Sequence, residues 1–237
     1  MAELSTRCER LKAEIESALS IGEVRPWNPL CDVIVHASLR EYQRALGADV
    51  GDSVGCATMQ YDQGRVVSRR IDLRLDGDDW QVDALPHELT HVVVADWLGN
   101  RRIPPWLDEG LGVLSESNTK RQFRAAAYTA ALRRSAVYSV PDLVHLRSFP
   151  QPDDRDAFYV QIAGLVRLLI DRSGPDEFER FAHTVLSADV DRALRQTYHI
   201  RGLDELERMV QGTDTARLVP LGGMLQESTA LVADADE

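Results

Sequence analysis

The spacing of apolar positions changes along the chain, from mixed helix and strand patterns in the first third to helical patterns in the rest. Residues 3 to 20 carry apolar side chains at helical spacing, which predicts an amphipathic helix. Residues 31 to 36 are rich in β-branched side chains and predict a strand. Ser38 then predicts the start of a short helix to Leu46, with Glu41 placed to complete a capping box.

Two more strands are expected between residues 54 and 75, where short apolar runs flank the turn signal Asp62-Gln63-Gly64. The second run, residues 66 to 75, alternates apolar and charged side chains from residue 69 onward, which predicts a strand with one face in water. Beyond the strands, Asp83 is expected to cap the next helix, with Pro86 in its first turn.

From residue 107 the pattern is helical, and Gly and Pro mark the interruptions. Residues 148 to 156 contain two prolines and are expected to form a loop at the rim of a cleft. Helices are expected over residues 107–117, 119–134, 140–146, 156–172, 188–198 and 203–211, with another starting at Pro175.

This order of elements predicts an α+β fold. With 237 residues, 44% of them hydrophobic, the chain is large enough for one well-formed core. We expect an N-terminal helix and connector over residues 1–30 and a body over 31–212, in which a β-rich lobe (31–80) precedes a helical lobe (81–212). Residues 213–237 are acidic, with few large apolar side chains, and are expected to be loosely held.

Charge and hydropathy narrow the range of partners. The 38 Asp and Glu residues exceed the 27 Lys and Arg residues, and the net charge of −11 argues against nucleic acid or an anionic membrane as a partner. No run of 18 apolar residues occurs, so no transmembrane helix is expected. The first residues lack the basic-then-apolar order of a signal peptide. The chain as written is therefore expected to be cytoplasmic, or exported if a leading segment has been removed.

The cysteines Cys8, Cys31 and Cys56 are widely spaced and include no C-x-x-C pair. Either they are three small apolar residues, or one bridge forms, for instance between Cys31 and Cys56, if the protein is exported. His36, at the end of a predicted strand, is interpreted as a polar strand-end residue and not as a metal ligand.

The stretch His87-Glu88-Leu89-Thr90-His91 places three side chains that can bind a metal or transfer protons within five residues. On a helix the two histidines lie about 40° apart around the axis, and Glu88 lies about 60° from His91 on the same side. One helix face therefore presents two imidazoles and one carboxylate to a cleft. The opposite face can be buried, since it carries Leu85, Leu89, Val92 and Val93.

Two histidines at this spacing predict a zinc site, because a catalytic zinc takes three protein ligands and keeps a fourth position for water. Glu109 is the best candidate for the third ligand. The gap after His91 allows the first helix to end and a second to begin near Trp106, after two prolines. Glu109 would then lie in the first turn of that helix. Gly110 and Gly112 are unfavourable inside a helix and indicate that it passes close to a neighbour.

The stretches His87-Glu-Leu-Thr-His91 and Pro105-Trp-Leu-Asp-Glu109-Gly resemble the gluzincin metallopeptidases, in particular the compact bacterial group called peptidase MA-like. The resemblance extends from about residue 33 to residue 210. It implies a zincin-like fold, with the active-site helix between a small β-sheet lobe and a mainly helical lobe. It also implies a zinc peptidase that binds Zn²⁺ through His87, His91 and Glu109 and cleaves peptide or protein substrates.

Glu88 is interpreted as the general base, which takes a proton from the zinc-activated water and carries it to the leaving amine. In the peptidases that this chain resembles, a Tyr or His from a later helix donates to the oxyanion, and on that resemblance Tyr159 is the choice. The residues alone do not separate Tyr159 from other candidates, or from a Tyr packed with its hydroxyl at the surface. The other candidates are Tyr128, Tyr138, Tyr198, His145, His183 and His199.

Three further assignments concern the surroundings of the site. Asp108, beside the third ligand, either holds a ligating imidazole through its second nitrogen or is a solvated acid. Trp106 is interpreted as a packing anchor. In gluzincins a strand bordering the cleft can pair with extended substrate, and by that analogy residues 66–75 are the nearest candidate.

Two classes of function fit these residues. The first is a zinc peptidase, and the second is a non-catalytic binding or scaffold protein that retains the fold with a structural or vestigial zinc. Glu88 favours the enzyme, because a structural zinc has no use for a general base.

Overall fold

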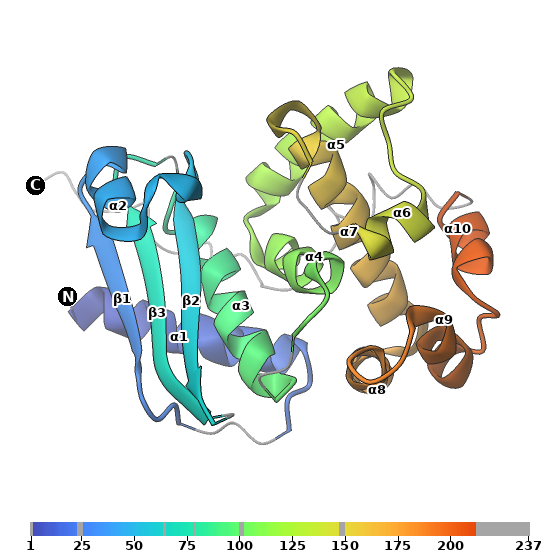
Figure 1. Ribbon diagram of the computed structural model, residues 1–237, viewed down its shortest axis with the longest axis horizontal. Helices are drawn as coiled ribbons and strands as arrows, with labels where there is room; N and C mark the ends of the chain where they lie inside the picture. The colour runs from blue at the N-terminus through green and yellow to red at the C-terminus, as the bar shows by residue number, and fades with distance from the viewer. Residues whose placement is uncertain are drawn as a thin grey trace, which may run out of the picture.

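A small sheet stands at one end of the molecule and a helical body at the other, with helix α3 (Ala84–Trp97) between them (Figure 1). The computed structural model describes residues 2–22, 26–63, 65–77, 79–99, 102–146 and 150–211. The predicted α+β class is confirmed. The acidic segment 213–237, which was expected to be loosely held, lies outside the described residues.

The sheet has three strands, β1 (Cys31–His36), β2 (Gly55–Asp62) and β3 (Arg65–Arg74), in the order β1-β3-β2. β2 and β3 form the predicted antiparallel hairpin, whereas β1 runs parallel to β3. A parallel pair needs a long crossover connection. Here α2 (Leu39–Leu46), the 3₁₀ turn Ala48–Val50 and β2 supply it.

Residues 66–75 were predicted to form the strand that borders the cleft, and this prediction was wrong. They form most of β3, which is the central strand and is paired on both edges. Its last half is covered on both faces, because Ile71, Asp72 and Leu73 have no exposed surface. The strand beside α3 is β2. Alternation along one strand reports which side chains face solvent, and the order of strands depends on pairing between distant segments.

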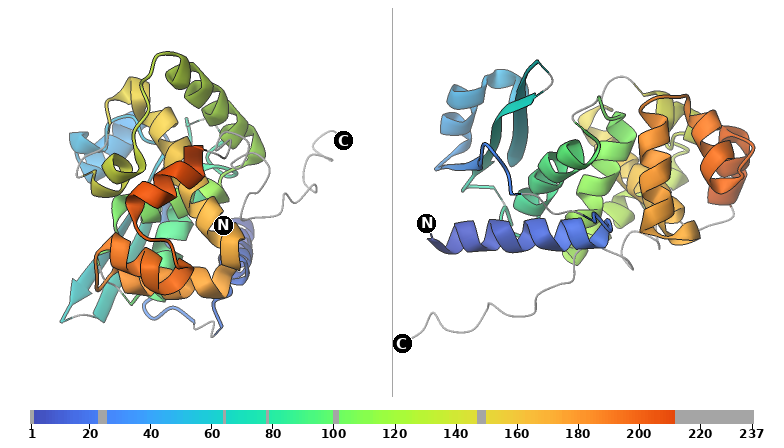
Figure 2. Two further views of the ribbon diagram at one scale, coloured as in Figure 1. Left: turned by 90° about the vertical axis from the view of Figure 1, so that its right-hand side faces the viewer. Right: turned by 90° about the horizontal axis from the view of Figure 1, so that it is seen from below.

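The N-terminal helix α1 (Ala2–Ala18) is confirmed and packs against α3, the helix between the two parts. The right-hand view of Figure 2 shows α1 running past α3 along one side of the molecule. Leu11 and Ile15 of α1, with Leu19 just beyond its end, are buried and join the same core as α3.

α3 contacts β2 on one side and α4 (Pro105–Ser115) on the other. The apolar face predicted for α3 is buried. Asp83 stands at the N-cap position, as predicted, but its side chain does not cap the helix. Its Oδ1 atom accepts the backbone amide of Ser117 at 2.9 Å instead. The capping prediction was therefore wrong, because the chain leaving α4 brings a competing donor to this carboxylate.

The helical body is built around α7 (Pro152–Ser173), which packs against α4, α5 and α8. α7 begins at Pro152, so the prediction of a loop over 148–156 was wrong from residue 152 onward. Proline at the first helical position lacks only a hydrogen-bond donor that would have no partner there. No helix of the described residues is long and apolar enough to cross a bilayer. The other elements are α5 (Asn118–Arg133), α6 (Val140–His145), α8 (Pro175–Val185), α9 (Val190–Ala193), a π-helical turn (Leu194–Tyr198) and α10 (Leu203–Gln211).

The cysteines Cys8, Cys31 and Cys56 are free thiols. Cys31 is opposite Arg69 in the β1–β3 ladder, and Cys56 is opposite Asp72 in the β2–β3 ladder. Positions 69 and 72 of one strand point to opposite faces of the sheet. A bridge between Cys31 and Cys56 is therefore incompatible with this fold, because the two side chains leave the sheet in opposite directions.

Candidate metal centre

Three ligand-type side chains converge where α3 and α4 meet. His87 and His91 lie one turn apart on α3, with ring centroids 4.9 Å apart, and Glu109 reaches them from α4. The Glu109 Oε2 atom lies 3.3 Å from His87 Nε2 and 4.0 Å from His91 Nε2. One donor atom of each residue lies within 4.8 Å of the others, so the group could hold a metal ion. No other such group occurs among the residues that the structure describes.

Two glycines allow α4 to lie this close to its neighbours, as the sequence predicted. A Cβ atom on Gly112 would lie 2.9 Å from two ring atoms of His87. A Cβ atom on Gly110 would lie 2.7 Å from a methyl group of Val166 on α7. α4 therefore fits between α3 and α7 only because these two positions carry no side chain. Any larger residue at position 112 would push the His87 ring away from Glu109.

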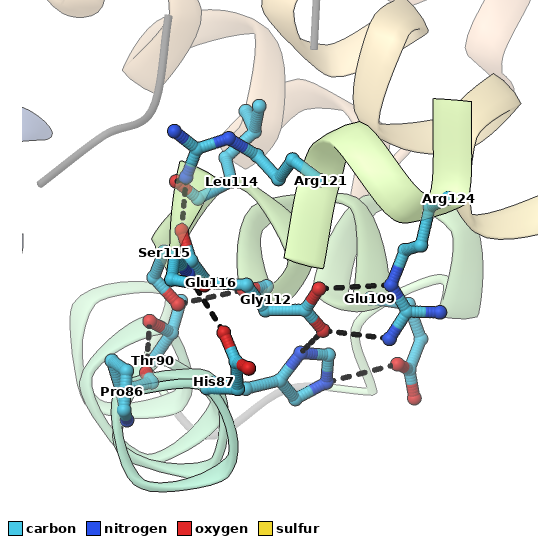
Figure 3. A network of polar contacts seen from close by, with 12 residues as sticks. Pro86, His87, Thr90, Glu109, Gly112, Leu114, Ser115, Glu116, Arg121 and Arg124 are labelled. Carbon is cyan, nitrogen blue, oxygen red and sulfur yellow. Dashed lines mark hydrogen bonds and ion pairs between the residues drawn. The ribbon is translucent and has the colours of Figure 1, made fainter. Parts of the chain in front are cut away.

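On the side of its ring that faces away from Glu109, His87 contacts a buried carboxylate (Figure 3). Its Nδ1 atom lies 3.0 Å from Oε1 of Glu116, which follows the last residue of α4. The Arg124 guanidinium donates to both oxygens of Glu116, from Nε and Nη2, at 2.8 Å each. Arg121 donates to the main-chain carbonyl of Glu116. With Nδ1 engaged in this way, Nε2 is the ring atom that remains for a ligand on the Glu109 side.

His91 has a looser partner. Its Nδ1 atom lies 2.9 Å from Oδ1 of Asp108, but the angles of this contact are not those of a hydrogen bond. The Asp108 side chain is 29% exposed, against 4% for Glu116. Both alternatives for Asp108 therefore hold in part. Its carboxylate lies beside a candidate imidazole ligand, and it is also partly in solvent.

Carboxylates control the charge of both imidazoles. Burial works against their protonation, but Glu109 and Glu116 outweigh it and raise the pKa of His87 well above its ordinary value. The charge of Asp108 likewise overcomes burial and raises the pKa of His91 to about 9. Despite its own burial, the pKa of Glu116 is held at about 2 by its cationic neighbours. Three carboxylates around two imidazoles favour a cation at this place.

Glu88 points from α3 toward β2. A Cβ atom on Gly55 would lie 2.7 Å from Cγ of Glu88, so this strand position has room only for glycine. Burial raises the pKa of Glu88, although the charges of His91 and His87 oppose the shift. The carboxyl group is therefore a better proton acceptor at neutral pH than an ordinary glutamate.

A cleft of about 530 Å³ opens between β2 and the α4 and α7 helices and exposes these groups. Its wall includes His87, Glu88, His91 and Glu109, which the sequence singled out, and also Asp108. The β2 side of the wall is lined by Gly55, Cys56, Ala57, Met59 and Tyr61.

Tyr159 also lines the cleft. Its ring stands edge-on to that of His87, with centroids 6.5 Å apart, and the Arg124 guanidinium lies 4.4 Å from its ring centroid. Burial and the charge of Glu109 raise the pKa of the Tyr159 hydroxyl, which keeps the proton on it. None of the alternative donors lines this cleft: Tyr128, Tyr138, Tyr198, His145, His183 and His199 all lie elsewhere. Trp106 is 1% exposed, as expected of a packing anchor.

The sequence interpretation missed Glu116 and Arg124. A signal for Glu116 was present, because it is the first acid after the apolar run Leu111 to Leu114 and so stands at the end of a buried helix. Arg124 carried no such signal, since it lies in a helix rich in arginine and alanine. Only the packing of α5 on α7 turns this arginine inward, to 8% exposure.

A family model described as the Peptidase MA superfamily matches residues 56–211. The match confirms the resemblance stated from the two motifs, although it begins at β2 and not near residue 33. It includes α3, α4 and α7, which carry the ligand-type residues and Tyr159. No curated protein and no solved structure matches the chain.

Proposed function

Because this chain belongs to the Peptidase MA superfamily, with a match over most of its length, we propose that it is a zinc-dependent peptidase with a zincin-like fold. One observation carries the proposal: two imidazoles of α3 and a carboxylate of α4 converge in a cleft that also holds Glu88. We take residues 31–212 as the catalytic unit, since β1 pairs with β3 and so completes the sheet that borders the cleft.

The donor set fits zinc. Two imidazole nitrogens and one carboxylate oxygen form one of the ligand sets of catalytic zinc, with bonds of about 2.0–2.2 Å. Tetrahedral geometry at that bond length separates the donors by about 3.3 Å. The distances of 3.3 and 4.0 Å from Glu109 Oε2 to the two Nε2 atoms lie close to that value. Magnesium and calcium prefer sites made of oxygen ligands, so a site with two imidazoles does not suit them.

In this proposal His87, His91 and Glu109 hold the ion. Zinc, when bound, lowers the pKa of a coordinated water and polarises the carbonyl of the scissile bond. The protein groups around it do the rest. Glu88 accepts a proton from the attacking water at its carboxylate and delivers it to the leaving nitrogen. The raised pKa of Glu88 suits this exchange, because the group must both take and release a proton near neutral pH.

Tyr159 is proposed as the donor to the oxyanion that develops on the substrate carbonyl. It lines the same cleft, and its hydroxyl donates to no described residue. Its raised pKa keeps the hydroxyl protonated, as a donor must be. Glu116 holds the His87 ring through a hydrogen bond at Nδ1, and Asp108 places its charge beside Nδ1 of His91.

The test is Glu88→Gln, with zinc content and peptide hydrolysis measured on the same preparation. We expect unchanged zinc, because Glu88 is not a ligand, and a loss of kcat of at least about 100-fold. Glu14→Gln, at an ion pair on the surface of α1, is the matched control and should change neither quantity. Equal hydrolysis by Glu88→Gln and the parent protein would overturn the mechanism.

The non-catalytic alternative predicts a different result. A binding protein with a structural zinc would retain the metal and hydrolyse no member of a broad peptide library, even when fully loaded. The position of Glu88 in an open cleft beside the metal group argues for the enzyme. A library digest with the zinc-loaded protein decides between the two and reports cleavage specificity.

A further inference from the structure

Arg155 is a cation in the cleft that the catalytic proposal does not use. It lies on α7, one turn before Tyr159, and lines the cleft together with His91 and Glu109. Residues four apart on a helix lie on the same face. Arg155 and Tyr159 therefore point into the same space. Among the described residues that line the cleft, Arg155 alone is an arginine or lysine.

The acids on either side of Arg155 in the chain have partners, whereas Arg155 has none among the residues that the structure describes. Asp156 binds Arg124, with 2.6 Å between Oδ1 and Nη1, and Asp154 lies 3.8 Å from a guanidinium nitrogen of Arg134. Arg155 forms no hydrogen bond or ion pair with any residue in the described part of the chain, and its Nε atom is buried without an acceptor. The two adjacent acids, Asp154 and Asp156, are thus engaged elsewhere, and the guanidinium keeps its donors for another group.

The chemistry of that group follows from the guanidinium. Its planar fork of N–H donors matches the two oxygens of a carboxylate, and such charged pairs are stronger than neutral hydrogen bonds. The acids of the cleft, Glu88, Asp108 and Glu109, lie on the α3 and α4 side, around the metal group. On the α7 side, away from these acids, Arg155 is therefore the cationic side chain that the cleft offers to an incoming carboxylate. The overall charge of −11 does not describe this local field.

We propose that Arg155 binds a carboxylate of the peptide substrate, so that the enzyme prefers peptides with an acidic group close to the bond that is cleaved. The carboxylate is an Asp or Glu side chain or the free C-terminus of the peptide. This inference rests on the proposed peptidase function and names its substrate class.

The experiment uses the zinc-loaded full chain and four fluorogenic peptides with one common core. The first carries Glu near the cleaved bond and an amidated C-terminus, and the second carries Gln in its place. The third is the Gln peptide with a free C-terminus, and the fourth carries Lys. For the parent protein we expect kcat/KM for an acidic peptide to exceed that for the Gln peptide by about 10- to 100-fold. Preference for the first peptide identifies a side-chain carboxylate, and preference for the third identifies the C-terminus.

In Arg155→Gln the acidic and neutral peptides should be cleaved equally well. In Arg155→Glu the order should reverse in favour of the Lys peptide. Arg134→Gln is the matched control, since Arg134 is 58% exposed and pairs with Asp154 outside the cleft. It should keep the preference of the parent protein. An unchanged preference in Arg155→Gln, or a parent protein that does not distinguish the four peptides, would overturn the inference.

A binding measurement separates this inference from the proposed function. The Kd of each peptide is measured by fluorescence anisotropy, with the parent protein and with Arg155→Gln. If the peptides are cleaved and their relative rates do not depend on Arg155, the peptidase proposal is supported and the inference about Arg155 is refuted. If no peptide is cleaved, the peptidase proposal is refuted, and the Kd values then decide the inference about Arg155. Tighter binding of an acidic peptide that is lost in Arg155→Gln supports it, and equal Kd values refute it.

Discussion

Two histidine–carboxylate pairs of this protein share their chemistry and differ in their surroundings. In the cleft, His87 Nδ1 lies 3.0 Å from Glu116 Oε1, and beneath α2, His36 Nε2 lies 2.7 Å from Asp72 Oδ1. Both carboxylates are buried, and each also binds an arginine side chain. Each imidazole also stands edge-on to a tyrosine ring, which is Tyr42 for His36 and Tyr159 for His87.

The two pairs differ in whether further ligand-type side chains lie nearby. His87 has His91 one turn away and Glu109 across the helix interface, whereas the His36 pair belongs to no metal-binding group within the described residues. A buried carboxylate beside an imidazole therefore orients the ring and does not by itself make a metal site. A metal site would also need a ligand from a separate element, and α4 supplies a candidate in Glu109. His36 is, as interpreted from the sequence, a polar strand-end residue.

The largest effect is expected from Glu109→Ala, which would make the cleft pair resemble the His36 pair. With the third ligand gone, zinc affinity should fall well beyond the roughly 10- to 100-fold that follows from the loss of an outer partner. Competition with a chromophoric chelator measures this affinity. Full zinc occupancy in Glu109→Ala would mean that the third ligand is another residue.

The two tyrosines give the next contrast. Tyr159→Phe should lower kcat by about 100-fold, because one oxyanion donor typically contributes that much, and should leave zinc content unchanged. Tyr42→Phe is the matched control. The Tyr42 hydroxyl lies 3.0 Å from Ser53 Oγ, so its loss should reduce the free energy of unfolding by about 1 kcal/mol and spare kcat. Turnover by Tyr159→Phe at the level of the parent protein would assign Tyr159 to packing.

Glu116→Gln tests the orienting role of the buried carboxylate. Zinc affinity should fall by about 10- to 100-fold, since the amide orients His87 more weakly and no longer balances the charge of Arg124. The same chelator titration on Asp72→Asn is the control, and it should show no change. If both variants lost zinc equally, the loss would reflect damage to the fold and not to the site.

The smallest effect is a pH dependence of stability from Asp72. Burial alone would raise the pKa of Asp72, but hydrogen bonds from Arg70 and His36 lower it below its ordinary value of 3.8. Its contribution to the free energy of unfolding is therefore complete above about pH 4 and is lost as pH falls through the lower folded value. Urea unfolding should show Asp72→Asn to be about 1–3 kcal/mol less stable at pH 7, with the difference shrinking below pH 4. A constant difference at every pH would contradict this account.

Local spacing was enough to predict many of these features. The helical repeat places His87 and His91 on one face of α3, and this result needs no knowledge of the rest of the chain. The glycines of α4 likewise indicated a close neighbour before that neighbour was known. Tyr159 is different, because the resemblance to a family selected it among several tyrosines. Its place in the cleft agrees with that choice, and its catalytic role is still a prediction.

The order of residues therefore decides the helices, the hairpin and the side of α3 that carries the imidazoles, because these depend on neighbours within a turn or a strand pair. The packed molecule alone decides that β2 and not β3 borders the cleft and that Glu116 and Arg124 lie behind His87. It also decides that Arg155 faces the cleft with no partner among the described residues. Each of these depends on segments far apart in the chain. Contacts of that kind are set by how helices and strands stack around one core, and no short window of sequence contains them.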